Sequence, residues 1–488
     1  MTSMRRVDSG WRHGRRAGAW LGAWAWTLLA SGTPGLAQDL GVKAPAQAGP
    51  VAIVGATVHP VTGPAIAGGV VVIENGLIAS VGPADGAALE ALRARGVEIV
   101  EAQGKHVYPG LIGAYTHLGL EEISAVRATL DKAEVGAATP EVRAAVAVNP
   151  DSTLIPVTRS AGVLVVGVFP ATSFDGQLAY FSGPGGFMPG RASVMRLDGW
   201  TWEDMTVVPD AGLSINWPQA RPITAWWMNK TAAEQQKDID RATRAIEAMV
   251  AGARAYIDER RADAALPTDI RYEAMRGIFA GAEGDKDRRP VFILASDAEQ
   301  IAQAVAFTRK HGLRCVIVGG FDAPRCAELL KETGTGVIVT GTMRFPKRDD
   351  SAYDEAFTLG SRLEALGVNW AMASGEIAAH ERNLPMSAAM AVAHGLDHDA
   401  GVAAITIRPA RLLGIADRYG SLEPGKSGTL IVTDGDILEV ATRVERAFID
   451  GRAINLNDKQ KTLAEKYREK YRQADAKGGD EEKGGGAR

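Results

Sequence analysis

Residues 291–318 read VFILASDAEQIAQAVAFTRKHGLRCVIV, and this stretch indicates the fold class of the chain. Two short apolar runs, Val291–Ala295 and Cys315–Val318, flank a segment whose apolar residues recur at helical spacing. Asp297 stands where a helix should begin, and Gly312 stands where it should end. The stretch therefore predicts a strand, a helix and a second strand, which is the repeating unit of a parallel α/β sheet.

Apolar runs of the same kind occur on both sides of this unit, at residues 107–114, 162–168, 336–339 and 369–373. With 488 residues, the chain has room for a barrel of about 250 residues and a smaller module. The segment from Gly199 to Trp227 holds five tryptophans and lacks the strand–helix pattern. We interpret this segment as an insertion near the barrel mouth, the edge at which the strands' carboxyl ends lie.

Short strands with turn residues between them are expected near both ends of the chain. Residues 52–81 contain two β-branched runs separated by Asn75 and Gly76, which is a strong hairpin signal. Residues 428–433 and 446–452 show the same pattern of short strand-like runs and turn residues. Each set alone is too small to form a stable sheet. We therefore predict that the two sets complete one small β-sandwich, which brackets the α/β region.

The N-terminus has the layout of a signal peptide. Basic residues up to Arg16 precede an apolar stretch, Ala17–Ala30, and small residues precede Gln38. The apolar stretch ends at Ser31, so it is shorter than the roughly 20 residues that a membrane span needs. We predict cleavage after Ala37, no stable membrane span in the mature chain, and export to the periplasm or the extracellular space.

The composition is that of an ordinary globular protein, with 46% hydrophobic and 23% charged residues. A net charge of −4 without a basic run in the body argues against a nucleic-acid partner. Residues 457–488 predict a charged helix followed by a disordered tail. Cys315 and Cys326 are the two cysteines, and their spacing allows a disulfide, although buried unpaired thiols are the commoner outcome.

Three motifs resemble the imidazolonepropionase-like enzymes of the amidohydrolase superfamily. They are KHVYPGLIGAYTHLG at residues 105–119, Asp175-Gly176-Gln177, and the run that extends from Ile407 to Val432. The resemblance covers roughly residues 50–456 and implies an α/β fold, a (β/α)8 TIM-like barrel with a small composite β-sandwich. The domains expected from it are a signal peptide (1–37), two parts of the sandwich (38–108 and 416–456), the barrel (109–415) and the C-terminal tail (457–488).

The same resemblance places a metal site at the barrel mouth, and most of its ligand positions are replaced here. The family binds one or two divalent metals with a His-x-His pair after the first strand, single histidines after strands five and six, and an aspartate after strand eight. In this chain, Tyr115 replaces the first histidine and His117 remains. The later positions fall at Leu294, at Gly319-Gly320 and beside Glu376. Leucine and glycine side chains cannot bind a metal, so we expect no cofactor, apart from one weakly held ion such as Zn²⁺ at His117.

His117, Tyr115 and Glu376 are therefore the candidate catalytic residues. His117 is either a remaining ligand or a histidine held by hydrogen bonds, and Tyr115 either fills the volume of the metal or donates to a substrate. Glu376 is either a displaced general base or a solvated loop carboxylate. His380, His394 and His398 are weaker candidates near the same region.

Two hypotheses about function follow. The first is a hydrolase that cleaves C–N bonds in a cyclic amide, an amidine or a dipeptide-like molecule. The second is a catalytically inactive barrel that binds a small ligand or a protein partner, because fold does not imply activity.

Overall fold

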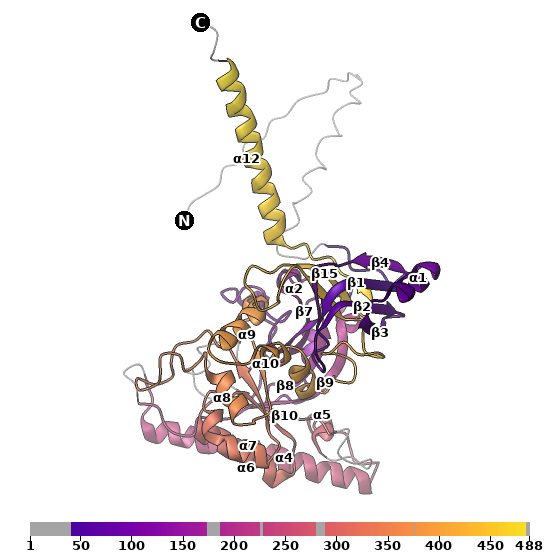
Figure 1. The fold of residues 1–488 in the computed structure, drawn as a ribbon. Coiled ribbons are helices and arrows are strands. Elements are labelled where there is room, and N and C mark those ends of the chain that lie inside the picture. Colours follow the sequence, from indigo (N-terminus) through magenta and orange to yellow (C-terminus); the bar gives the residue numbers. More distant parts are fainter. Residues whose placement is uncertain (1–40, 173–185, 225–227, 280–287, 376, 485–488) are drawn as a thin grey trace, which may run out of the picture. The chain divides into compact units, whose positions relative to one another are not determined.

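A computed structural model describes residues 41–172, 186–224, 228–279, 288–375 and 377–484 (Figure 1). The predicted signal peptide, the Asp175-Gly176-Gln177 motif and Glu376 lie outside the described residues. Within the described ranges, no helix is both long enough and apolar enough to cross a bilayer.

Eight strands form one nearly closed sheet in the order β13-β12-β11-β10-β9-β8-β7-β6, and β13 also packs against β6. The strands are β6 Leu111–Thr116, β7 Val163–Val168, β8 Gly190–Arg196, β9 Thr206–Asn216, β10 Val291–Ala295, β11 Cys315–Gly319, β12 Gly336–Thr340 and β13 Trp370–Ala373. All the apolar runs predicted as strands between residues 107 and 373 contribute to this sheet or to a second sheet, described below, that contains strands from both ends of the chain. This arrangement fits the TIM-like barrel that the sequence predicts.

One strand departs from a uniformly parallel barrel. β8 is antiparallel to both β7 and β9, whereas the other neighbouring strands are parallel. The connection from β8 to β9 consists of Leu197–Met205 with the short helix α3 (Trp202–Met205), which is too short for the crossover that parallel neighbours need. The prediction of an all-parallel sheet was wrong at this strand.

The interpretation of residues 199–227 as an insertion was also wrong in part, because β9 lies within this segment and is a strand of the barrel. Pro209 and Asp210 interrupt the apolar pattern of β9 and hide the strand from a pattern search. The Asp210 carboxylate is buried and accepts hydrogen bonds from Arg191 and Arg289. A charge that is paired in this way can lie inside a barrel strand.

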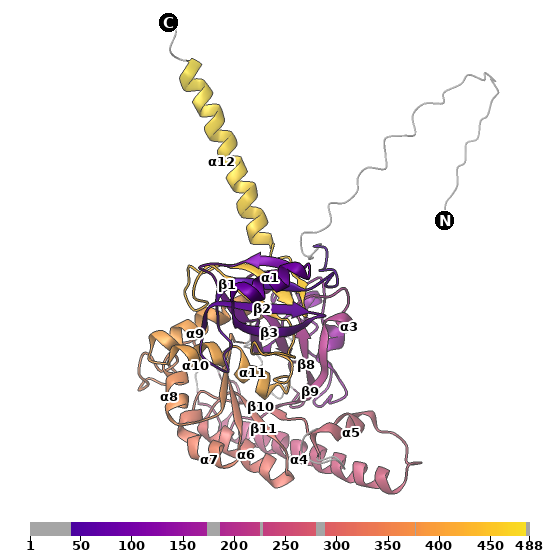
Figure 2. The same cartoon turned by 45° about the vertical axis from the view of Figure 1, so that its right-hand side comes forward.

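Apolar side chains fill the inside of the barrel. Ile112, Val165, Phe292 and Val316 come from four different strands and belong to one buried cluster. Helix α11 (Ile407–Leu412) adds Ile407 and other residues to the same cluster. Helices on the outside complete the α/β layers (Figure 2). They are α2 Leu154–Ser160, α4 Ala232–Ala262, α5 Ile270–Ala274, α6 Ala298–His311, α7 Ala327–Glu332, α8 Leu359–Ala365, α9 Leu384–Ala393 and α10 His398–Ala404.

Helix α6 begins and ends where the sequence predicts. The side chain of Gln300 accepts hydrogen bonds from the backbone N–H groups of Ser296 and Asp297, at 3.2 Å each. Gly312 ends the helix with a φ of 61°, a left-handed conformation that suits glycine.

Cys315 and Cys326 are both unpaired, and burial raises the pKa of the Cys315 thiol to about 12.

Strands from the two ends of the chain pair in a second sheet, whose order is β16-β15-β14-β5-β1-β2-β3, with β4 beside β1. The strands are β1 Val51–Val58, β2 Ile66–Glu74, β3 Leu77–Pro83, β4 Glu98–Glu101, β5 His106–Pro109, β14 Leu430–Thr433, β15 Val444–Ile449 and β16 Arg452–Ala453. β14 is antiparallel to β5, with Ile431 opposite Tyr108. Asn75 and Gly76 form the turn between β2 and β3, both with positive φ.

Each face of this small sheet buries its own apolar cluster. Val107, Leu430 and Phe448 share one cluster, so residues from both ends of the chain form it together. The other face packs Ala52 and its neighbours against Leu92 of helix α1 (Gly86–Ala94). These eight strands thus form a single hydrogen-bonded sheet, to which the N-terminal and the C-terminal segments both contribute strands.

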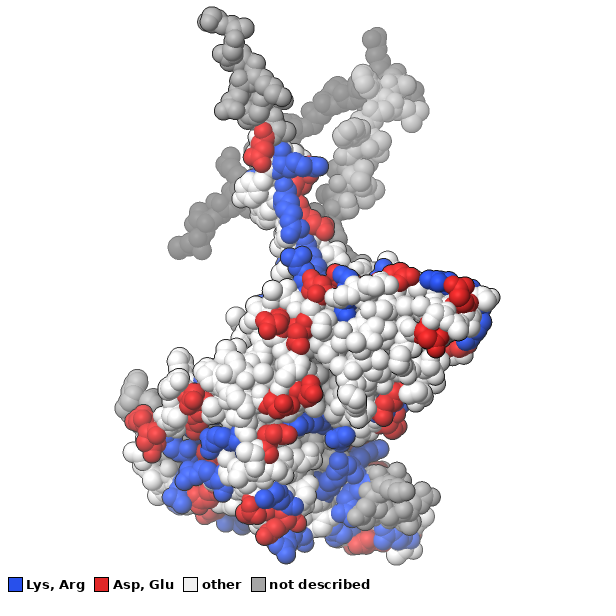
Figure 3. All heavy atoms as spheres, viewed as in Figure 1, with Lys and Arg blue, Asp and Glu red and all other residues white. Residues whose placement is uncertain are grey.

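The chain continues into helix α12 (Lys459–Gly484). The predicted charged helix is therefore present, and it extends to Gly484, into the stretch predicted as disordered. On the face drawn in Figure 3, acidic and basic side chains of the described residues are interspersed over the barrel, and basic side chains follow α12.

Candidate active site at the barrel mouth

The carboxyl end of β6 positions both predicted residues of the first motif. The pairing of β6 with β7 is irregular between Gly113 and Thr116, where three steps along β6 oppose two along β7. Tyr115 is buried in the core inside the barrel, and His117 follows directly after the strand with 5% of its surface exposed. The rings of Tyr115 and His117 are in edge contact, with centroids 5.5 Å apart.

Aromatic rings occupy the interior volume next to His117. Tyr115 packs on Phe169, with ring centroids 4.7 Å apart, and Phe169 makes a T-shaped contact with Phe292 at 4.9 Å. None of these three side chains is more than 2% exposed. Such a close-packed apolar cluster leaves little room for hydrated ions.

His117 is held as a neutral imidazole. Its Nδ1 lies 2.8 Å from the carbonyl oxygen of Phe169. Because a carbonyl can only accept, Nδ1 carries the proton and Nε2 carries the lone pair. Burial lowers the pKa of His117 to about 4, although the Phe169 carbonyl opposes this shift. Near neutral pH, His117 therefore offers an uncharged base.

A buried ion pair lies close enough to His117 to influence its charge. Lys132 Nζ donates to Glu121 Oε2 at 2.5 Å, and both side chains are less than a tenth exposed. The positive charge of Lys132 lowers the pKa of His117 and the negative charge of Glu121 raises it. Sequence reasoning missed this pair, because lysine and glutamate in a loop are usually solvated.

The strand ends that bind metal in the family lack suitable groups here. Leu294, near the end of β10, packs against the core inside the barrel. Gly319 and Gly320 have φ values of 104° and 61°, and a Cβ at Gly320 would lie 2.4 Å from the Val337 Cγ1 atom. A histidine at Gly320 would therefore be strained and would clash.

Among the described residues, the side chains do not assemble into the metal centre that the resemblance implies. Within the described ranges, which exclude Glu376, no group of three His, Cys, Asp or Glu side chains is arranged to hold a metal ion. His398 instead pairs with Asp436 at 2.8 Å, and the ring of His394 packs on Phe357. His380 lies in a short 3-10 helix, residues Ala378–Asn383.

Glu381 is a buried carboxyl group that the sequence did not single out. It is fully buried, and Ser374 Oγ donates to its Oε2 at 2.6 Å. Its Oε1 has no hydrogen-bond partner in the described part of the chain, and it lies 2.1 Å from where a Cβ would stand on Gly113. Burial raises the pKa of Glu381 to about 7. Because Gly113 belongs to β6 and Ser374 follows β13, Glu381 lies where the first and last barrel strands meet.

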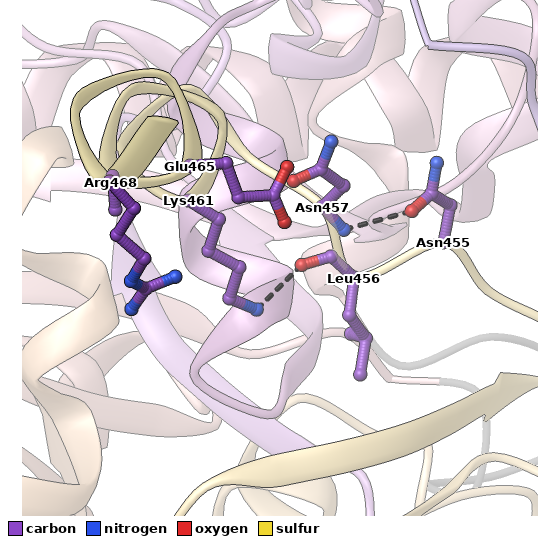
Figure 4. Close-up of a pocket in the computed structure, with 7 residues that line it drawn as sticks. Asn455, Leu456, Asn457, Lys461, Glu465 and Arg468 are labelled. Carbon is purple, nitrogen blue, oxygen red and sulfur yellow. Dashed lines mark hydrogen bonds between the residues drawn. The ribbon is translucent and has the colours of Figure 1, made fainter. Parts of the chain in front are cut away.

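An open hollow of about 500 Å³ lies elsewhere, at the start of α12 (Figure 4). Asn455, Leu456, Asn457, Lys461, Ala464, Glu465 and Arg468 line it. Lys461 Nζ donates to the Leu456 carbonyl at 2.6 Å, which ties the helix to the preceding segment. The hollow contains none of the predicted site residues, so size alone does not make it the candidate site.

Comparisons with known proteins agree with the fold. The amidohydrolase family model matches residues 279–456. Amidohydrolase tasK of Hapsidospora irregularis is 23% identical over 419 residues, which cover 79% of this chain and 40% of that protein. This chain thus matches only about two fifths of that relative's length.

An amidohydrolase from Thermotoga maritima MSB8 has a similar crystal structure. The TM-score is 0.69 at 23% identity, and the match covers 83% of this chain and 99% of the other. At this identity the likeness concerns the fold. The family model over residues 279–456 and the curated relative agree with this likeness, so the comparisons support a place for this chain in the amidohydrolase superfamily.

Proposed function

We propose that this chain is a hydrolase-like protein that binds a small molecule at its barrel mouth without the metal centre of its family. The observation that carries the metal-free part of the proposal is the packing of Tyr115, Phe169 and Phe292 beside His117, the histidine that remains of the family's His-x-His pair. The replaced positions at Leu294 and Gly320 support it. By its superfamily, the molecule would be a cyclic amide, an amidine or a dipeptide-like compound.

Hydrolysis of a C–N bond without a metal is the second candidate. The neutral state of His117 favours it, because an uncharged imidazole can take a proton from water near neutral pH. In this mechanism, His117 would act as the base, with Tyr115 as a donor and Glu376 as a further carboxylate. Leu294 and Gly320 supply no second group beside His117, and a pKa near 4 makes His117 a weak base, so binding without turnover is the leading proposal.

Elemental analysis of the purified protein tests the proposal. We expect well under one equivalent of Zn, Mn or Fe, because a site that has lost several imidazoles should bind a metal poorly. His117→Ala should leave this content unchanged. His311→Ala is a matched control, because His311 pairs with Glu247 at the end of α6.

The two candidates separate when hydantoin and glycylproline are incubated with the protein and the products are followed by NMR. Turnover that survives chelators and is lost in His117→Ala would favour hydrolysis without a metal. A tightly held equivalent of metal that is lost in His117→Ala but not in His311→Ala would contradict the metal-free proposal.

We also propose that the protein acts after export, in the periplasm or outside the cell. The basic and apolar stretch before Gln38 supports this proposal. The intact mass of the mature protein should correspond to a chain that begins at or near Gln38. Recovery of the chain from membranes with Trp20–Trp26 still attached would contradict it.

A further inference from the structure

The loop of residues 341–357, which follows β12, lies across the ends of three neighbouring strands. Asp297 follows β10 and Asp322 follows β11. Lys347 forms ion pairs with both of these carboxylates, and Arg348 makes a two-pronged pair with Asp322. Glu355 accepts a hydrogen bond from the backbone N–H of Lys347 at 2.8 Å. Ion pairs thus anchor this loop over the part of the mouth where the family has its strand-five and strand-six ligands.

Arg344 in this loop has one edge in use and one edge without a partner. Its Nη1 donates to the carbonyl of Phe345 at 3.1 Å and to Glu355 Oε2 at 3.5 Å. The guanidinium plane lies over the Phe321 ring, 4.0 Å from the centroid. Nε and Nη2 are buried and have no hydrogen-bond partner among the residues that the structure describes.

The two unpartnered atoms make a specific geometry. Nε and Nη2 point their N–H bonds the same way, so they form the side-on fork of a guanidinium, which matches the two oxygens of a carboxylate. Leaving buried donors unsatisfied costs about 1–3 kcal/mol for each group. An acceptor that bonds both donors at once would remove this cost, and a carboxylate is such an acceptor.

The surrounding charges favour an anion with a single charge. In the ion pairs, Asp297, Asp322 and Glu355 balance Arg344, Lys347 and Arg348, and the same loop carries three further carboxylates, Asp349, Asp350 and Asp354. A carboxylate would bring one negative charge to the Nε and Nη2 edge of Arg344. A divalent phosphate would bring two negative charges, and the second charge would have no positive partner. The cluster therefore suits a carboxylate better than a phosphate.

The same loop presents apolar side chains to solvent. Met343, Phe345 and Tyr353 are 52%, 92% and 81% exposed. Met343 and Phe345 are the sequence neighbours of Arg344, and Tyr353 lies in the same loop, so a molecule bound to Arg344 could cover some of this apolar surface. The loop thus combines a carboxylate fork with exposed apolar groups.

We propose that the Nε and Nη2 edge of Arg344 binds the carboxylate of a small organic acid that carries an apolar group, at the mouth of the barrel. This proposal rests on the proposed function, because it assigns the chemical class of the molecule that the mouth binds. It makes Arg344 the residue that selects for the acid over the corresponding neutral amide.

Calorimetric titration with hippurate and with its neutral analogue hippuramide tests the proposal. Both probes carry a benzoyl-amide group, and they differ in the carboxylate. We expect the wild-type protein to bind hippurate about tenfold more tightly than hippuramide. Arg344→Lys keeps the charge but loses the fork, so it should abolish this preference by weakening the binding of hippurate. Arg408→Lys is the control, because both Nη atoms of Arg408 already bind Glu364.

The outcomes distinguish this proposal from the proposed function. Equal binding of the two probes by wild-type protein would overturn the role of Arg344 and leave small-molecule binding at the mouth intact. A preference for hippurate that survives in Arg344→Lys would also overturn the role of Arg344 and leave small-molecule binding at the mouth intact. If neither probe binds at tens of millimolar, the carboxylate assignment falls, and binding of hydantoin or glycylproline then decides the proposed function separately.

Discussion

Lys132→Met should destabilise the folded protein by about 4 kcal/mol, because it leaves a buried carboxylate without its counter-charge. Glu121 is 7% exposed, and the Lys132 ammonium, at 2.5 Å, is its ion-pair partner. Methionine has a similar length but cannot donate a hydrogen bond or supply a charge. Urea unfolding near neutral pH measures the loss as a shift of the midpoint.

The double variant Lys132→Met/Glu121→Leu should recover most of this stability, since replacing both members of a buried pair by apolar residues is often nearly neutral. Arg261→Met is the control for loss of a pair at the surface. Arg261 and Asp258 are 69% and 60% exposed, so we expect a change below about 1 kcal/mol. A loss in Lys132→Met no larger than in this control would show that Glu121 is not a buried charge.

Glu381→Gln should change how stability depends on pH. Burial raises the pKa of Glu381 from 4.5 to about 7 in the folded protein. Between these values the folded state holds the proton more tightly than the unfolded state does, so its stability falls as pH rises through this range. The contribution is complete below about pH 4.5 and is lost above about pH 7. Glutamine does not titrate, so its stability lacks this pH dependence. As pH rises from about 4.5 to about 7, the free energy of unfolding of the variant should therefore increase by about 3 kcal/mol relative to that of the wild type.

Chemical denaturation of both proteins at several pH values between about 4.5 and 8 measures this gain. Ser374→Ala provides a second readout. The hydrogen bond from Ser374 lowers the pKa of Glu381, so its loss should move the stability change to higher pH. If the wild-type and Glu381→Gln curves run parallel over the whole range, Glu381 is ionised in the folded protein and the assignment fails.

The barrel was predictable to the extent that its strands are uninterrupted apolar runs. Val291–Ala295 and Cys315–Gly319 are fully or nearly fully buried, so their sequences carry the pattern directly. β9 was missed because Pro209 and the paired Asp210 break that pattern. The reversal of β8 was not predictable from residue types, since strand direction depends on the length and path of the connections.

The candidate site was predictable only where a motif marks a position. The sequence located Tyr115 and His117 because the motif of residues 105–119 fixes their positions, and it located Leu294 from the apolar run of the strand that contains it. It gave no sign of Glu381 or Arg344. Their properties depend on burial and on partners that become neighbours only in the fold, such as Gly113 beside Glu381. Single residue types cannot report such long-range contacts.

The pairing of β5 with β14 has a consequence for synthesis on the ribosome. β5 ends at Pro109, and its partner strand begins at Leu430, so nearly the whole barrel is translated between them. At a translation rate of about 5–20 residues per second, the edge of β5 stays unpaired for on the order of 20–60 s before β14 is synthesised. During this time Val107 lacks Leu430 and Phe448, which later cover it. The nascent chain therefore exposes an incomplete sheet that chaperones can recognise until its last strands emerge.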